Sequence, residues 1–246
     1  MLQKKFSFYP DDLLMSLSKD NSIYLTYHEA TLYCSDIEYL RAGTWLNDHI
    51  ILFAYEYFQY SSKYKDIMGT VCLCHPMNTM LLQYGDIEDL QDIANSLEFC
   101  TKDYIFVPIN NASFGDFSQN GTHWALLVVD RKESRFLMYD SMGNRSSATS
   151  NMLKTIQNLS KILDSSRAFE TLRVNVPQQQ NSFDCGMYCI CFTEAILENL
   201  RCEAKGQGSC DLYKGKKYLE VCTPSHITSS RDRLREAVED LKAQSK

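Results

Sequence analysis

The sequence predicts an α+β fold in a single domain, and three observations support this. Strand-sized apolar runs lie in the middle of the chain, between about residues 104 and 140. Segments with helical periodicity stand on both sides of these runs. The 246 residues would allow one large domain or two small ones, but no internal repeat or long linker divides them. We therefore expect one domain over residues 1–246, with residues 1–21 as a less certain N-terminal extension.

Five segments carry the apolar spacing of helices. The first is W-L-N-D-H-I-I-L-F-A-Y-E-Y-F, starting at Trp45, in which apolar residues recur at i, i+3, i+4, i+7 and i+8 from Ile50. Asn47 or Asp48 is expected to cap this helix. The other four expected helices cover residues 86–97, 151–163, 185–200 and 231–243.

Four segments are expected to be strands, at residues 104–109, 122–129, 135–140 and 172–176. The second is an almost unbroken apolar run, which indicates burial on both faces. The last alternates Leu172, Val174 and Val176 and ends at Pro177. Residues 201–215 are polar with three glycines and predict a loop, whereas the first forty or so residues show no clear pattern.

The composition excludes several classes of protein. Apolar residues make up 44% and charged residues 23%, as in ordinary globular domains, and no window approaches a membrane span. The net charge of −6 argues against nucleic acid as a partner and would suit a partner with a basic tail. The N-terminus lacks the apolar stretch of a secretory signal, and the spacing of the ten cysteines suggests no disulfide framework. We expect reduced thiols and a cytoplasmic or nuclear location.

Two expected strands bring a histidine and an aspartate together. The segment G-T-H-W-A-L-L-V-V-D-R-K-E-S-R-F-L-M-Y-D-S reads as a hairpin with its turn at Arg131 and Lys132. In that register His123 and Asp140 lie directly opposite each other, with Cβ atoms about 5 Å apart. A carboxylate placed there could orient an imidazole.

Cys185 stands at the start of an expected buried helix. Unpaired N–H groups and the helix dipole favour a thiolate at this position, and Asp184 is the expected N-cap. Gly186 would let a substrate carbonyl approach the sulfur. Cys189 and Cys191 lie on the apolar surface of the same helix and are expected to be core residues.

Three glutamines, Gln178 to Gln180, precede this cysteine. A side-chain amide near a thiolate could stabilise the oxyanion of a tetrahedral intermediate, and the residues alone do not decide between Gln179 and Gln180. Together with a thiol, a histidine and an aspartate, such an amide forms the set of groups found in cysteine hydrolases.

These residues resemble the Ulp/SENP-type cysteine proteases, which cleave ubiquitin-like modifiers. The matching motifs are W-L-N-D (45–48), G-T-H-W (121–124), Y-D-S (139–141) and Q-Q-N-S-F-D-C-G-M-Y (179–188), within a similarity covering roughly residues 22–243. The resemblance implies the papain-like fold of this family, a central mixed sheet flanked by helices. It also implies His123 as general base, Asp140 as its orienting acid, Cys185 as nucleophile and Gln179 as oxyanion donor, with no cofactor and no metal.

Family substrates end in Gly-Gly, threaded between tryptophans. The only two tryptophans of this chain, Trp45 and Trp124, lie in matching motifs, and Asp48 could pair with an arginine just before the glycines. The W-L-N-D-H stretch, Q-N-S-F-D-C-G-M-Y and the late T-P-S-H-I-T-S-S-R resemble the Nedd-specific (deneddylase) branch more than SUMO proteases. We therefore expect an isopeptidase acting on a Nedd-type modifier, with no nucleic-acid or membrane partner.

Other functions remain open on the sequence alone. The same residues would serve a SUMO-specific protease, and a catalytically silent module could bind ubiquitin-like proteins without cleaving them. Acetyltransferases of the same broad clan use a similar triad. A zinc site at C-L-C-H (72–75) is disfavoured because no second Cys/His pair stands nearby in the sequence.

Overall fold

The structure is a computed structural model of the whole chain, and it describes residues 21–112, 121–163, 166–208, 211–213 and 219–245. Nearly all of the expected N-terminal extension (1–21) therefore lies outside the described residues, as does part of the expected 201–215 loop. No helix among the described residues is long and apolar enough to cross a membrane.

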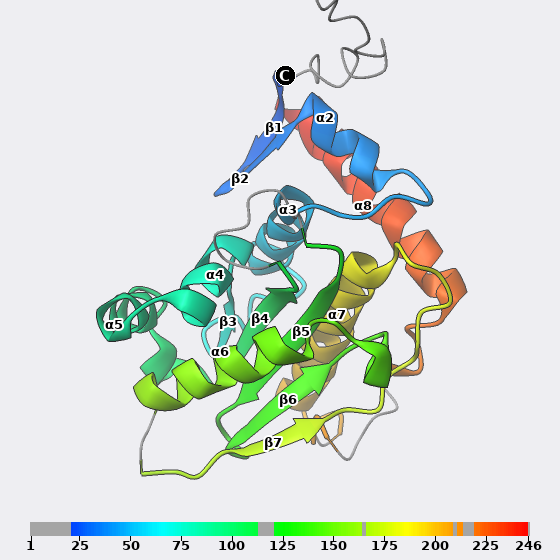
Figure 1. Cartoon of the computed structure of the whole chain (residues 1–246). Coiled ribbons are helices and arrows are strands. Elements are labelled where there is room, and N and C mark those ends of the chain that lie inside the picture. The colour runs from blue at the N-terminus through cyan, green and yellow to red at the C-terminus, as the bar shows by residue number, and fades with distance from the viewer. Residues whose placement is uncertain (1–20, 113–120, 164–165, 209–210, 214–218, 246) are drawn as a thin grey trace, which may run out of the picture.

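A five-stranded mixed sheet forms the centre of the fold, in the order β3-β4-β5-β6-β7 (Figure 1). Its strands are β3 (Val71–Leu73), β4 (Tyr104–Asn110), β5 (Trp124–Asp130), β6 (Arg135–Tyr139) and β7 (Glu170–Arg173). The inner pairs β4–β5 and β5–β6 are antiparallel, whereas the edge strands β3 and β7 run parallel to their neighbours. The expected mixed sheet flanked by helices is confirmed.

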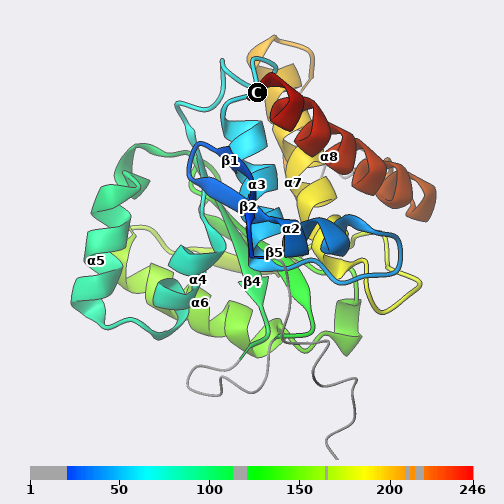
Figure 2. The ribbon, with the colours of Figure 1, turned by 90° about the horizontal axis from the view of Figure 1, so that it is seen from above.

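Helices cover both faces of this sheet (Figures 1 and 2). One face carries α3 (Asp48–Gln59) and α7 (Cys185–Ala204), with α8 (Pro224–Gln244) packed outside α7. The other carries α4 (Pro76–Tyr84), α5 (Ile87–Ser96) and α6 (Thr149–Ile162). Short 3-10 turns lie at Glu38–Leu40, Phe99–Thr101 and Gly143–Arg145.

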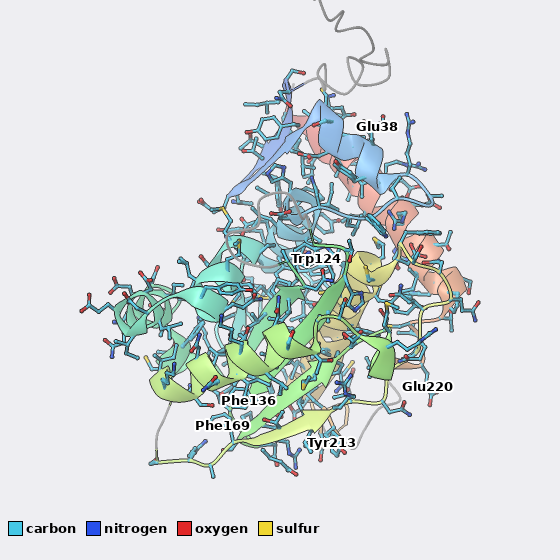
Figure 3. The ribbon with its side chains drawn as sticks, in the orientation of Figure 1. Glu38, Trp124, Phe136, Phe169, Tyr213 and Glu220 are labelled. Atoms are coloured by element: carbon cyan, nitrogen blue, oxygen red, sulfur yellow. The ribbon has the colours of Figure 1, made fainter. Side chains whose placement is uncertain are left out.

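Strand β5 explains why the core has two halves. All seven of its residues are buried. Trp124, Leu126 and Val128 belong to the core under α3 and α7, and the alternate residues belong to the core under α4, α5 and α6. The expected burial of this strand on both faces is confirmed. Figure 3 shows Trp124 at the end of β5 nearest α3, and Phe136 and Phe169 at the opposite end of the sheet.

The N-terminal region folds into elements that the sequence left unassigned. Strands β1 (Ile23–Tyr27) and β2 (Ala30–Tyr33) form a separate hairpin, followed by the short helix α2 (Cys34–Ile37). The tight turn between β1 and β2 has His28 at φ 49°, a left-handed conformation that is typical of glycine or asparagine. His28 stacks on Tyr60, with ring centroids 3.3 Å apart, and so fixes the turn against α3.

Several expected boundaries need correction. The expected strand 172–176 is wrong in position, because β7 ends at Arg173 and most of its residues are exposed. Val174 and Val176 are buried, but only Val174 continues the pairing, through one backbone bond to Met138. Helix α7 runs four residues past the expected end at Leu200 into the expected loop, and α8 starts seven residues earlier than expected, at Pro224.

Candidate active site

His123 and Asp140 meet at the ends of two adjacent strands. His123 directly precedes β5, and Asp140 directly follows β6. The imidazole Nε2 lies 2.9 Å from Asp140 Oδ1, and the two side chains are only 3% and 1% exposed. A contact between these two residues was expected from the sequence, and it is present.

The register expected for this hairpin is wrong. Leu126 pairs with Tyr139, so the strands are shifted by two residues from the expected pairing. The loop spans residues 131–134, with Ser134 at φ 54°, because Arg131 and Lys132 do not suit the positive φ angles of a two-residue turn. A shift of two keeps both side chains on one face, where diagonal neighbours remain within reach. His123 and Asp140 are therefore diagonal rather than directly opposite.

Backbone contacts hold both residues in place. Asn111 Oδ1 accepts hydrogen bonds from the backbone N–H groups of Thr122 and His123, at 2.7 and 3.0 Å. Asp140 Oδ1 also accepts from the backbone N–H of Met142, at 2.9 Å. Asn111 was not identified from the sequence, since nothing in the local pattern distinguishes it from a loop asparagine.

The pKa of His123 is strongly perturbed. Burial alone would lower it, but the hydrogen bond that His123 donates to Asp140 and the interaction with Cys185 outweigh burial and raise the pKa to about 9. The pKa of Asp140 is lowered, because its interaction with His123 overcomes the opposing effect of burial. With Nε2 directed at a carboxylate, Nδ1 is the ring nitrogen available to the thiol. Nδ1 is buried and makes no hydrogen bond among the described residues, so its approach to the sulfur is too long or too poorly aligned for one.

Cys185 is the first residue of α7 and is 2% exposed. The expected capping by Asp184 is wrong in detail. Asp184 occupies the N-cap position, but its carboxylate caps no backbone N–H and instead pairs with Arg231 at 2.8 Å. Asn181 organises the turn, accepting from the backbone N–H groups of Phe183 and Asp184 at 3.1 and 3.0 Å.

Gly186 allows close packing at the start of α7. A Cβ at this position would lie 2.9 Å from the Cβ of Leu46, in the W-L-N-D segment. The first turn of α7 therefore lies directly against the segment before α3. The close backbone packing expected at Gly186 is present, and the approach of a substrate carbonyl to the sulfur stays a prediction.

Cys189 and Cys191 lie in the core, as expected. Both are 1% exposed, and burial raises the pKa of each, to about 12 for Cys191. Of the residues in C-L-C-H, His75 bonds to Glu56 at 3.0 Å. No group of three potential metal ligands occurs among the residues that the structure describes.

The structure separates the two glutamines that the sequence left open. Gln179 is buried, and Gln180 is exposed. Gln179 Oε1 accepts from Ser141 Oγ at 2.6 Å, and Nε2 donates to the carbonyl of Asn181 at 2.6 Å. Ser141 directly follows Asp140, so this amide lies beside the end of β6.

Both tryptophans donate hydrogen bonds to backbone carbonyls near the start of α7 or of α3. Trp124 is buried, and its Nε1 donates to the carbonyl of Leu46 at 3.1 Å. Trp45 is 49% exposed, and its Nε1 donates to the carbonyl of Ser182 at 2.6 Å. Asn47 caps α3 by accepting from the N–H of Ile50, which leaves the exposed Asp48 without a capping role.

Comparisons with known proteins identify the family of this chain. The Ulp1 protease family, C-terminal catalytic domain, matches residues 44–205. The chain belongs to the Ulp1 protease family. Sentrin-specific protease 8 of Rattus norvegicus is 32% identical over 222 residues, covering 89% of this chain and 95% of the relative. NEDD8-specific protease 1 of Arabidopsis thaliana is 27% identical, covering 75% of this chain and 79% of the relative.

Solved structures support the same fold. A structure described as the de-sumoylating protease superposes with a TM-score of 0.65 at 20% identity, covering 88% of each chain. Members of the Ulp1 family are cysteine peptidases, and so is this chain. His123, Trp124, Asp140, Gln179 and Cys185 all fall within the matched region, as do Trp45 and Asp48.

Proposed function

We propose that this peptidase cleaves after the C-terminal Gly-Gly of a Nedd-type ubiquitin-like modifier, releasing it from conjugates and from extended precursors. The observation that carries the chemistry is the buried His123–Asp140 pair beside Cys185 at the start of α7. The modifier class is favoured by relatives named as NEDD8-specific proteases and as sentrin-specific protease 8. We also propose a cytoplasmic or nuclear location, as expected from the sequence.

In the proposed mechanism, Cys185 passes its thiol proton to His123, and the resulting thiolate attacks the carbonyl of the last glycine of the modifier. Asp140 holds the imidazole of His123 with Nδ1 toward the sulfur, and His123 delivers a proton from Nδ1 to the leaving amine. Water then attacks the thioester, with His123 accepting its proton, and frees the modifier and the thiol. The Nε2–H of Gln179 would stabilise the oxyanion of both tetrahedral intermediates.

The tail of the modifier would pass between Trp45 and Trp124. The indole of Trp45 donates a hydrogen bond to the carbonyl of Ser182, shortly before Cys185, and that of Trp124 donates to the carbonyl of Leu46. Two indoles fixed in this way fit the walls of a narrow channel. Glycine, with no Cβ, is the residue suited to such a channel. Asp48 is exposed in the first turn of α3 and is the proposed partner of an arginine preceding the glycines.

Labelling with modifier probes tests this proposal. Nedd, SUMO and ubiquitin probes bearing a C-terminal electrophile would be added side by side, and the modified residue found by peptide mapping. The proposal expects Cys185 to be labelled, fastest by the Nedd probe. Labelling of another residue would refute the mechanism. Faster labelling by the SUMO probe would refute the choice of modifier, and tight binding without labelling would indicate a catalytically silent module.

A further inference from the structure

Arg231 is a buried charge that the proposed reaction does not use. It lies in α8, at the end of the T-P-S-H-I-T-S-S-R segment, and its side chain is 4% exposed. A buried guanidinium is unfavourable unless its N–H groups are paired with acceptors and its charge with a carboxylate. The partners of Arg231 therefore decide where this side chain can lie.

Those partners come from two segments far apart in the sequence. Nη2 donates to Asp184 Oδ1 at 2.8 Å, one residue before Cys185. Nη1 donates to the carbonyls of Tyr39 and Arg41, at 2.9 and 3.2 Å, in the segment that leads to Trp45. A planar guanidinium can serve both segments at once, whereas a lysine ammonium is a single point charge.

On one side, a chain of hydrogen bonds runs from Arg231 to Gln179. Asp184 Oδ2 accepts from Asn181 Nδ2 at 2.8 Å. The backbone carbonyl of Asn181 in turn accepts from Gln179 Nε2 at 2.6 Å. Arg231 therefore fixes the turn that orients the side-chain amide of Gln179 and begins α7.

On the other side, Arg231 binds the segment that leads to Trp45. Thr44 Oγ1 donates to the same two carbonyls that Arg231 binds, at 2.8 and 2.7 Å. Trp45 Nε1 donates to the carbonyl of Ser182, in the turn that Asp184 ends. The Trp45 segment and the 181–184 turn are thus joined twice, through Trp45 itself and through Arg231.

We propose that Arg231 is a positioning residue for the peptidase reaction. It sets the distance between the turn that carries Gln179 and Cys185 and the segment that carries Trp45, and it acts through Asp184 without touching the substrate. The inference rests on the roles given to these residues in the proposed function. It adds to them a contribution from the C-terminal helix, which lies outside the matched region 44–205.

The test compares Arg231→Lys with Arg235→Lys. Arg235 lies on the same helix, is 47% exposed and pairs with Asp232 of that helix, so it is a matched control. The readout is kcat and KM for a Nedd substrate with a fluorogenic C-terminal amide. We expect Arg231→Lys to lower kcat about tenfold or more while KM stays within about threefold, and Arg235→Lys to leave both unchanged. An unchanged kcat in folded Arg231→Lys overturns the proposal.

If Arg231→Lys does not fold, Asp184→Asn decides in its place. This variant keeps one oxygen acceptor for Arg231 but removes the charge and the second oxygen, which accepts from Asn181 Nδ2. The same selective loss of kcat is expected. A normal kcat in Asp184→Asn would then overturn the proposal.

Alkylation of Cys185 by iodoacetamide gives a readout that needs no modifier. If wild-type protein cleaves none of the modifiers, the proposed function fails, but the alkylation rate still reports on Arg231. A rate changed by about threefold or more in Arg231→Lys or Asp184→Asn, and not in Arg235→Lys, supports the positioning role. Equal rates in all of these proteins overturn it.

Discussion

The Nε2 nitrogen of His123 donates a hydrogen bond to Oδ1 of Asp140 over 2.9 Å, between two side chains that are almost fully buried. The pair forms although the two residues are not opposite each other in the hairpin, because a register shift of two residues leaves both on the same face. This contact leaves Nδ1 as the nitrogen that faces the thiol, and the proposed chemistry depends on that orientation.

The first prediction concerns the dependence of stability on pH. The pKa of His123 is about 9 in the folded protein and about 6.5 in an unfolded chain. Because the folded value is the higher one, the stabilisation is complete below about pH 6.5 and is lost as the pH rises to about 9. The free energy of unfolding should fall by up to about 3 kcal/mol over this range, measured by urea denaturation. Asp140→Asn should largely remove this dependence of the free energy of unfolding on pH. An unchanged dependence in that variant would contradict its assignment to the His123–Asp140 pair.

The second prediction separates the two glutamines. Gln179→Ala removes a buried amide next to Ser141, and kcat should fall by about 10² to 10³ with little change in KM. Gln180→Ala changes an exposed side chain and should keep kcat within about twofold of wild type. Steady-state kinetics on the fluorogenic Nedd substrate measures both. The opposite ranking would make Gln180 the oxyanion donor.

The third prediction concerns the contact between Gly186 and Leu46. Gly186→Ala places a methyl group 2.9 Å from the Leu46 Cβ and should lower the free energy of unfolding by about 1 to 3 kcal/mol. Gly69→Ala is the control, because a Cβ there meets nothing within 4 Å. Thermal or urea unfolding measures both variants. Equal stability of the two would show that the first turn of α7 does not depend on this close contact.

The fourth prediction assigns Asp48 to the substrate tail. Asp48→Ala should lower kcat/KM about two- to fivefold on a tail with arginine before the glycines, since it removes one exposed ion pair with the substrate. The same variant should match wild type on a tail with alanine in place of that arginine. A loss of equal size on both tails would assign Asp48 to the folding of α3 instead.

The sequence predicted the inner strands of the central sheet and the contact between His123 and Asp140 for definite physical reasons. Strand β5 and helix α7 are apolar on nearly every side, and such segments are recognisable because only a buried position tolerates them. The contact between His123 and Asp140 followed from the parity of two adjacent strands. Side chains alternate between the two faces of a strand, so a register error of two residues leaves each side chain on its face. The contact was therefore predicted correctly although the predicted turn was wrong.

The remaining features depend on contacts that the sequence does not encode locally. The β1–β2 turn uses His28 in a left-handed conformation, held by stacking on Tyr60 rather than by a glycine. Asp184 stands where a cap is expected, but its carboxylate is drawn to Arg231, 47 residues away. Gly186 is closely packed because Leu46 lies against it. Each of these depends on a partner distant in the chain.

The hydrolysis of modifier amides tests the central claim most directly. Nedd and SUMO substrates with a fluorogenic group on the last glycine would be compared for wild type and for Cys185→Ala. We predict that wild type cleaves the Nedd substrate with kcat/KM at least about 100-fold above that for SUMO, and that Cys185→Ala cleaves neither. Retention of activity in Cys185→Ala, or a higher kcat/KM for SUMO, would contradict the account.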